Sequence, residues 1–211
     1  MTQHDFEFPN IRPLLDELGF RPSKYKSQHF LHHREACEKI AALCELTPTH
    51  RVVEIGTGLG NLSCELARHA GRVVSVEMDE TFREWHAKLE REIPNLDIFY
   101  GDFLKVDLDQ VVPREPEGPL VVCGNLPYQI TAPILFRLLE ADAEWERIVA
   151  MVQLEVAERI VAGPGTRRAS ALTYKLALDY DSEIAAKIGP KSFIPPPKVN
   201  SAVVVLTPKA A

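Results

Sequence analysis

A strand-like segment that runs directly into three alternating glycines is the feature that most restricts how this chain folds. Residues 51–55, Arg-Val-Val-Glu-Ile, have the composition of a buried strand. Gly56, Gly58 and Gly60 follow at once, and a helix is expected to begin near Asn61. Glycines at such a turn let the backbone approach a ligand closely, and the new helix offers unpaired N–H groups. The segment therefore predicts an α/β sheet with a nucleotide or nucleoside site at one edge.

Strands and helices continue to alternate along the rest of the chain. Strands are expected at residues 72–77, 96–100, 120–124 and 148–152, and helices near residues 79–92, 132–139, 154–161 and 169–178. Residues 183–188 and 201–206 form two final strands, close enough in sequence to pair antiparallel. This order predicts an open, mostly parallel sheet with helices on both faces and an antiparallel pair at one edge. We expect one such domain over residues 35–211, preceded by an N-terminal basic segment over residues 1–34.

Acidic side chains follow the next two expected strands. Glu77 ends the second strand, about 20 residues after the glycine turn, where a carboxylate is placed to accept hydrogen bonds from both hydroxyls of a ribose. Asp102 follows the third strand and is placed to accept from an adenine amino group, with Phe103 packed on the ring. The alternative for each acid is a helix cap or a turn former. Asn61 stands where a dinucleotide motif has Gly or Ala, which favours a ribose ligand without pyrophosphate, such as S-adenosylmethionine.

The tetrapeptide Asn125-Leu126-Pro127-Tyr128 has the groups needed to hold a planar amine for alkylation. An exocyclic amine on a nucleobase is a poor nucleophile, because its lone pair is delocalised into the ring. Acceptance of both N–H hydrogens, by the Asn125 side-chain oxygen and a backbone carbonyl beside the proline, favours a geometry that frees the lone pair. Tyr128 is then free to stack on the ring. A plain turn after a buried strand is the alternative interpretation.

The charge of the chain is uneven. Its net charge of −6 argues against a protein that coats nucleic acid unaided. Residues 21–34 nevertheless carry four Lys or Arg side chains and three histidines without one acid, and a second basic cluster surrounds the turn at residues 163–165. Each cluster is either a phosphate-facing edge or a solvated surface. The candidate RNA contacts are Lys24, Lys26, Arg34, Arg167, Arg168 and Lys198.

Cysteine spacing and hydropathy exclude several other classes. The four cysteines, at positions 37, 44, 64 and 123, have neither CxxC spacing nor histidine partners, so we expect reduced, mostly buried thiols and no metal site. The N-terminus lacks the pattern of a secretion signal, and no apolar run approaches the ~20 residues that cross a bilayer. A cytoplasmic protein is expected.

Taken together and in order, several motifs resemble the KsgA-type ribosomal RNA adenine dimethyltransferases over nearly the whole chain, from about Ile11 to Leu206. The motifs are Gly-Phe-Arg-Pro at 19–22, Gln-His-Phe-Leu at 28–31, Glu-Ile-Gly-Thr-Gly-Leu-Gly at 54–60, Glu77, Asp102, Asn-Leu-Pro-Tyr at 125–128 and Phe-Ile-Pro-Pro-Pro-Lys-Val-Asn-Ser at 193–201. The resemblance implies a class I S-adenosylmethionine-dependent methyltransferase fold, with S-adenosylhomocysteine as product. It also implies methylation of N6 of adenosines in ribosomal RNA, in a small-subunit assembly particle, by a monomer that needs no metal.

The resemblance also implies roles for individual residues. Those of the cofactor pocket would be Gln28, His29, Leu31, Gly56, Gly58, Glu77, Met78, Asp102, Phe103 and Asn125. Those at the target amine would be Asn125, Leu126, Pro127, Tyr128 and Phe193. We expect the adenosine to leave its stack and to lie between Tyr128 and Phe193, with N6 held by Asn125 and the Leu126 carbonyl. For Phe193, a hydrophobic anchor of the proline-rich loop is the alternative.

The sequence departs from the family pattern at several points. His29 stands where Asn is usual, Ser27 where Gly is usual, and Thr57 where proline is frequent. Arg168-Ala169-Ser170 replaces a frequent Tyr-Gly pair, which leaves the RNA contacts there open. Family members usually continue into a small helical domain, whereas this sequence ends at residue 211. We expect either a shortened sequence or a single-domain member.

Three other functions share these features. The first is the sister class that methylates adenine in large-subunit rRNA and confers antibiotic resistance. The second is a non-catalytic relative that binds RNA or assists transcription. The third, an amino methyltransferase for DNA or protein glutamine, is disfavoured by the motif at residues 193–201.

Overall fold

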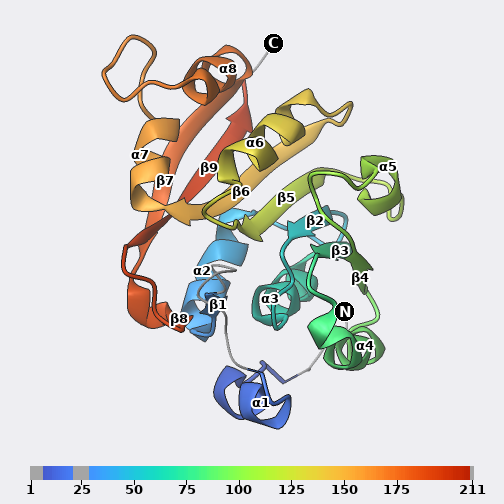
Figure 1. Ribbon diagram of the computed structural model, residues 1–211. Coiled ribbons are helices and arrows are strands. Elements are labelled where there is room, and N and C mark those ends of the chain that lie inside the picture. The colour runs from blue at the N-terminus through green and yellow to red at the C-terminus, as the bar shows by residue number, and fades with distance from the viewer. Residues whose placement is uncertain (1–6, 21–28, 210–211) are drawn as a thin grey trace.

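The computed structural model describes residues 7–20 and 29–209 and is built around a seven-stranded sheet (Figure 1). The strands lie in the order β4-β3-β2-β5-β6-β9-β7. Their bounds are β2 Arg51–Ile55, β3 Arg72–Glu77, β4 Leu96–Tyr100, β5 Leu120–Asn125, β6 Trp145–Gln153, β7 Tyr180–Ile188 and β9 Ser201–Pro208. The five strands from β4 to β6 are parallel, and β9 is antiparallel to both β6 and β7. The parallel sheet and the antiparallel edge pair predicted from the sequence are confirmed.

Helices cover both faces of this sheet because neighbouring strand residues point to opposite sides. Val52 packs in the cluster formed with α2, α3 and α4, whereas Val53 packs in the cluster formed with α5 to α8. The helix bounds are α2 Arg34–Leu43, α3 Asn61–His69, α4 Arg83–Glu92, α5 Leu108–Val111, α6 Thr131–Glu140, α7 Leu154–Ile160 and α8 Ala171–Asp179, with the short 3₁₀ helix η1 Glu80–Phe82 before α4. The strands are apolar on both faces, as a sheet buried between two helical layers requires.

A second, two-stranded sheet joins the N-terminal segment to the C-terminal part of the chain. Strand β1 Phe30–Leu31 pairs antiparallel with β8 Phe193–Ile194. The helix α1 Ile11–Glu17 precedes it, and the 3₁₀ helix η2 Pro190–Ser192 leads into β8. The elements α1, α5, β1 and β8 are too short to leave a clear pattern in the sequence. Helix α2 was also not predicted, although its buried residues Ala36, Cys37, Ile40 and Ala41 have helical spacing. The pairing of β1 with β8 holds residues more than 160 positions apart beside the carboxyl edge of the large sheet (Figure 1).

A buried acid lies beneath the glycine turn. Glu54, on β2, is fully buried, and the Ser63 hydroxyl donates a hydrogen bond of 2.5 Å to its Oε2. Oε1 has no hydrogen-bond partner among the described residues. Burial raises the pKa of Glu54 to about 7, and the hydrogen bond from Ser63 offsets part of that shift. The core next to the site therefore contains a carboxyl group that holds its proton well above the usual range.

We expect Gly124→Ala to destabilise the sheet. A Cβ at this position on β5 would lie 2.6 Å from the Ile55 carbonyl oxygen, so β2 and β5 must shift apart. We expect a loss of about 1–3 kcal/mol in the free energy of unfolding, measured by urea denaturation. Gly189→Ala is the matched control, because its Cβ would meet nothing within 4 Å. Equal stability of the two variants would contradict this packing.

Stability should fall as pH rises from about 4.5 to 7 through the contribution of Glu54. In that range the unfolded chain releases the Glu54 proton while the folded protein keeps it, so the unfolded state is favoured as pH rises. The raised pKa corresponds to a cost of about 3 kcal/mol at pH 8, which Glu54→Gln should relieve. Denaturation of both proteins at pH 4.5 and pH 8 measures this difference. The exposed residue Glu144 provides the control. If Glu144→Gln raises the free energy of unfolding at pH 8 as much as Glu54→Gln does, the explanation by burial of Glu54 is wrong.

Candidate active site

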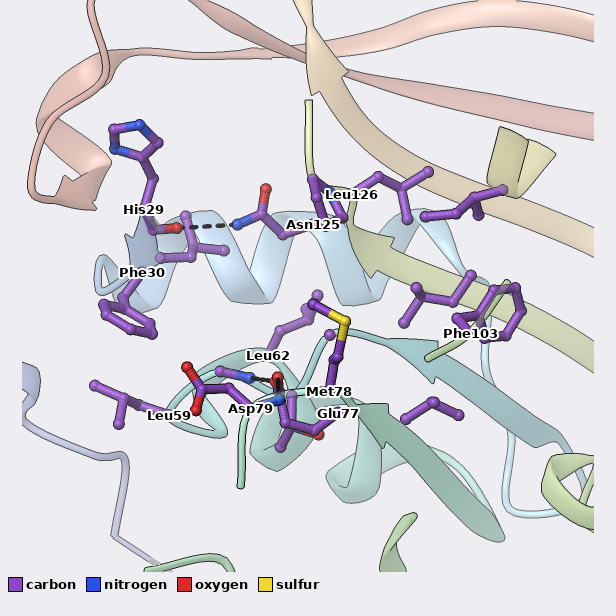
Figure 2. A pocket seen from close by; sticks show the side chains of 18 of the residues that line it. His29, Phe30, Leu59, Leu62, Glu77, Met78, Asp79, Phe103, Asn125 and Leu126 are labelled. Carbon is purple, nitrogen blue, oxygen red and sulfur yellow. Dashed lines mark hydrogen bonds between the residues drawn. The ribbon is translucent and has the colours of Figure 1, made fainter. Parts of the chain in front are cut away.

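One cavity opens at the carboxyl ends of β2, β3, β4 and β5, the edge where open α/β sheets bind ligands (Figure 2). Its lining includes many of the residues predicted from the sequence. These are His29, Leu31, Gly56, Gly58, Glu77, Met78, Asp102, Phe103, Asn125, Leu126, Pro127 and Tyr128. Gln28 lies outside the described residues. The structure therefore gathers into one hollow residues that lie up to 99 positions apart, from His29 to Tyr128.

The glycine turn has a backbone that few other residues adopt. Gly56, Gly58 and Gly60 have φ values of +85°, +56° and +84°, in the left-handed region that favours glycine. The Gly58 N–H donates to Glu77 Oε2 at 2.8 Å, which ties the turn to the end of β3. The N-terminus of α3 follows at Asn61 and leaves helix N–H groups beside the cavity. The turn is thereby shaped for close approach of a ligand.

Two aromatic side chains of α4 donate hydrogen bonds to backbone carbonyls of the same turn. Sequence patterns did not identify them as residues of the site. His86 Nε2 donates to the Gly58 carbonyl at 2.8 Å, and Trp85 Nε1 donates to the Leu59 carbonyl at 3.0 Å. Because a carbonyl accepts, His86 carries its proton on Nε2, and its Nδ1 accepts from the Tyr100 hydroxyl at 2.6 Å. Burial lowers the pKa of His86. Two aromatic residues on an amphipathic helix look like core residues in sequence, so their contacts with the turn appear only in the fold.

Glu77 and Met78 form the wall of the cavity at the end of β3. Glu77 Oε1 accepts from the Asp79 N–H at 2.8 Å, and its two oxygens retain further lone pairs for a ligand. Burial raises the pKa of Glu77, while the hydrogen bonds from the Asp79 and Gly58 amides oppose the shift. The Met78 side chain is 68% exposed although it is apolar, and Figure 2 shows it directed into the cavity. A carboxylate beside an unpacked thioether chain suits a ligand with hydroxyls and an apolar ring.

Asp102 and Phe103 line the next part of the cavity, after β4. Asp102 Oδ1 accepts from the Leu104 N–H at 3.0 Å, and Oδ2 lies 3.3 Å from the Lys105 ammonium. Asp102 therefore forms the turn that the sequence allowed as an alternative, while it also faces the cavity. Phe103 is 6% exposed and belongs largely to the core.

Asn125 ends β5 with its side-chain amide fixed in one direction. Its Nδ2 donates to the His29 carbonyl at 3.1 Å, which leaves Oδ1 to accept hydrogen bonds from a ligand (Figure 2). The Leu126 N–H donates to the Met151 carbonyl at 3.0 Å and extends the β5 and β6 pairing by one residue. Proline at 127 brings no N–H of its own. The side-chain oxygen of Asn125 and the carbonyl of the next residue, Leu126, therefore lie beside the cavity.

Tyr128 follows as an aromatic wall. Its hydroxyl is 3.0 Å from Ser201 Oγ at the start of β9, and partial burial raises the pKa of the phenol. The His29 ring lies nearly parallel to the Tyr128 ring, with centroids 5.9 Å apart and planes 28° apart. His29 Nδ1 lies 2.7 Å from the Pro195 carbonyl, so the hydrogen belongs to Nδ1.

Phe193 has a different environment from the one expected for a base-stacking residue. Its side chain is 2% exposed, packs in the core cluster of the α2 and α3 face, and does not line the cavity. In β8 it pairs with Leu31. Burial supports the alternative that the sequence left open, in which Phe193 anchors the proline-rich loop.

The candidate RNA contacts are distributed over separate parts of the surface. Arg34 donates to Glu38 at 2.9 Å, and Arg168 donates to Glu158 at 2.5 Å, so both guanidinium groups have acidic partners. Arg167 and Lys198 are exposed. Lys24 and Lys26 lie outside the described residues. Two of the four described cations would therefore exchange a carboxylate for a phosphate on binding RNA.

The described part of the chain contains no group of His, Cys, Asp and Glu side chains able to hold a metal ion. All four cysteines are free and buried. Within residues 7–20 and 29–209, no helix has the length and hydropathy needed to span a membrane.

Comparison with known proteins identifies the family. The family model described as ribosomal RNA adenine dimethylase matches residues 20–211. A ribosomal RNA small subunit methyltransferase A from Myxococcus xanthus is 42% identical over 197 residues, which cover 93% of this chain and 68% of that protein. The protein of the same name from Ligilactobacillus salivarius is 36% identical over 200 residues, 94% of this chain and 68% of the relative. The chain thus spans about two thirds of the length of these relatives.

Solved structures give the same result. A dimethyladenosine transferase from Plasmodium falciparum superimposes with a TM-score of 0.74 and 31% identity, over 86% of this chain and 64% of that one. The 23S rRNA methyltransferase ErmE superimposes with a TM-score of 0.73 and 34% identity, over 86% of this chain and 70% of that one. On sequence and on structure, the chain belongs to the ribosomal RNA adenine dimethylase family.

Proposed function

We propose that this protein transfers methyl groups from S-adenosylmethionine to N6 of adenosine in small-subunit ribosomal RNA. The observation that carries the proposal is the orientation of Asn125, whose Nδ2 is committed to the His29 carbonyl at 3.1 Å. Its Oδ1 is therefore preset to accept an N–H from the target amine. The names of the relatives support ribosomal RNA as the substrate.

The residues of the cavity fit the proposed methyl donor. Glu77 offers carboxylate oxygens for ribose hydroxyls, Asp102 offers an acceptor for the adenine amino group, and Met78 offers an apolar surface for the ring. The glycine turn allows close approach of the donor, and Asn61 stands at the position where a pyrophosphate-binding turn has its third glycine. When bound, S-adenosylmethionine supplies an electrophilic methyl group. The protein then has only to align the amine with it.

Two acceptors would align that amine. Asn125 Oδ1 accepts one N6 hydrogen and the Leu126 carbonyl accepts the other, which fixes the nitrogen and favours a lone pair out of the ring plane. Tyr128 stacks on the extruded base. The alkylated nitrogen releases a proton to solvent afterwards, so no side chain in the cavity has to act as the base. Two rounds of this step would give dimethyladenosine.

The substrate and setting belong to the same proposal. We propose a small-subunit assembly particle as substrate, because an acidic protein of net charge −6 gains little from bare RNA by charge alone. We also propose that the protein acts as a monomer and in the cytoplasm, where it would encounter such particles. The 23S rRNA methyltransferase ErmE is nearly as similar in fold as the dimethyladenosine transferase, so the RNA must be tested directly.

We expect wild-type protein to transfer tritiated methyl groups to undermethylated small-subunit particles, and Asn125→Ala to lower kcat by roughly 10²–10³-fold. The magnitude is that of removing one aligned hydrogen-bonding group from a transition state. Large-subunit rRNA and bare small-subunit rRNA serve as parallel substrates in the same scintillation assay. Transfer to large-subunit rRNA alone would replace the proposed substrate with that of the sister class. Full activity of Asn125→Ala would contradict the role of the amide.

Glu77→Gln should weaken binding of S-adenosylmethionine by roughly 10–100-fold. The change keeps an acceptor oxygen for the turn but removes the negative charge, and a hydrogen bond to a charged group contributes about 1.5–3 kcal/mol. Isothermal titration calorimetry measures the dissociation constant. The control is Glu84→Gln, which changes an exposed carboxylate of α4 that does not line the cavity. Unchanged affinity in the Glu77 variant would contradict the ribose assignment.

A further inference from the structure

We propose that His86 is a positioning residue for the methyl donor, which holds the glycine turn and Glu77 in the shape that binds the donor. The inference rests on the proposed function and concerns a side chain that does not line the cavity. His86 is fully buried in α4, and both of its ring nitrogens form hydrogen bonds. It acts on the donor side of the cavity, beside Glu77. The target side of the cavity lies beside Asn125 and Tyr128.

Both backbone groups of Gly58 are fixed, one on each side of its Cα. Its N–H donates to Glu77 Oε2 at 2.8 Å, and its carbonyl accepts from His86 Nε2 at 2.8 Å. The φ of Gly58 is +56°, and glycine loses more conformational freedom than any other residue when it is held in one conformation. A turn with three glycines therefore depends on bonds from outside to keep one shape before a ligand binds.

The hydrogen bonds close a ring around the carboxyl ends of β2, β3 and β4. Gly58 is bonded to Glu77 on one side and to His86 on the other. The Tyr100 hydroxyl then donates to His86 Nδ1 at 2.6 Å. Tyr100 ends β4 directly opposite Glu77 in the register of β3 and β4, so the contacts return to their start. A change at His86 is thus expected to reach Glu77 through the turn.

The His86 ring is neutral in this environment, which gives it one donor and one acceptor. Burial lowers the pKa of His86 and the charge of Arg83 lowers it further, although the Gly58 carbonyl and Asp79 oppose the shift. Because a carbonyl only accepts, Nε2 carries the hydrogen and Nδ1 is left to accept from Tyr100. Burial raises the pKa of Tyr100 to about 12, so its hydroxyl keeps the hydrogen that it donates.

Three substitutions at position 86 separate the two ring nitrogens. His86→Leu keeps a side chain of similar size and removes both hydrogen bonds. His86→Gln carries an amide N–H at about the position of Nε2 and so restores the bond to the Gly58 carbonyl. His86→Asn is shorter and reaches the Tyr100 hydroxyl but not Gly58. It replaces His86→Leu, with the same expected results, should the leucine variant not fold.

The neighbouring Trp85 provides a matched comparison. Its Nε1 donates to the Leu59 carbonyl at 3.0 Å, from the same helix to the same turn. The hydrogen bond from the turn to Glu77, however, comes from Gly58. Trp85→Phe keeps an aromatic ring and removes only the N–H. It therefore measures the effect of one lost bond to the turn that is not linked directly to Glu77.

Donor affinity is the first measurement. Isothermal titration calorimetry with S-adenosylhomocysteine should show that His86→Leu raises the dissociation constant roughly tenfold, the scale of one hydrogen bond lost from a preorganised site. His86→Gln should stay within about threefold of wild type, because it keeps the bond to the turn. In the methyl-transfer assay, His86→Leu should raise KM for S-adenosylmethionine by a similar factor and leave kcat at saturating donor nearly unchanged. Circular dichroism melting reports whether each variant is folded.

A second ligand separates positioning from a loss of stability. 2′-Deoxy-S-adenosylhomocysteine lacks one of the ribose hydroxyls assigned to Glu77. Wild type should bind it roughly tenfold more weakly than S-adenosylhomocysteine, whereas His86→Leu should distinguish the two ligands by less than about threefold. His86→Gln should regain the wild-type ratio. Trp85→Phe should keep that ratio too, because any loss of affinity it causes should be equal for both ligands.

The outcomes distinguish failure of this inference from failure of the proposed function. If wild type binds S-adenosylhomocysteine and His86→Leu has the wild-type affinities, or loses the same factor for both ligands, His86 is not a positioning residue and the function stands. Loss of the ratio in Trp85→Phe as well would also overturn the inference. If binding depends on His86 as predicted but no RNA accepts a methyl group, the inference stands and the proposed function fails. Failure of wild type to bind S-adenosylhomocysteine would overturn both.

Discussion

The hydrogen bond from the Asn125 side chain to the His29 carbonyl is the interaction on which the geometry of the target side depends. It joins the end of a central strand to the N-terminal segment, although these residues are 96 positions apart. It fixes which end of the Asn125 amide faces the target side. It also brings the His29 ring next to Tyr128. Without this bond the cofactor pocket would keep its glycine turn and acids, but the amide would be free to present either its donor or its acceptor.

The large sheet supplies the rigid frame for that bond. Parallel strands with apolar side chains on both faces place β2, β3, β4 and β5 with their carboxyl ends together, so a turn, two acids and an amide meet in one hollow. The pairing of β1 with β8 then closes the target side with a segment from each end of the described chain. The cofactor part of the cavity thus depends on the large sheet, and the part beside Asn125 and Tyr128 depends on the pairing of β1 with β8.

Sequence patterns predicted the sheet because its strands carry strong signals. Residues 51–55 and 72–77 match β2 and β3 without error, and the final antiparallel pair lies at the expected edge. The glycine turn, Glu77 and Asn125 could be placed because they follow strands directly, and a parallel sheet brings strand ends together. The hydrogen bonds from His86 and Trp85 to carbonyls of the glycine turn could not be predicted, because they depend on how α4 packs and not on a sequence period.

The target side was harder to predict for physical reasons. β1 and β8 have two residues each, which is too short for any alternation to show, and their partners lie across the whole chain. An aromatic residue before a proline-rich loop has the same sequence whether it faces a base or fills a core. In the structure Phe193 is buried in the core, and the His29 and Tyr128 rings lie beside each other with centroids 5.9 Å apart. Such contacts depend on the tertiary structure alone.

The most direct measurement is a crystal structure of the protein with S-adenosylhomocysteine and adenosine 5′-monophosphate bound together. The account predicts the donor ribose at Glu77 and the second adenine on the other side of Asn125, with its N6 within hydrogen-bond distance of Asn125 Oδ1 and of the Leu126 carbonyl. A second adenine bound away from Asn125, or a donor ribose away from Glu77, would contradict it.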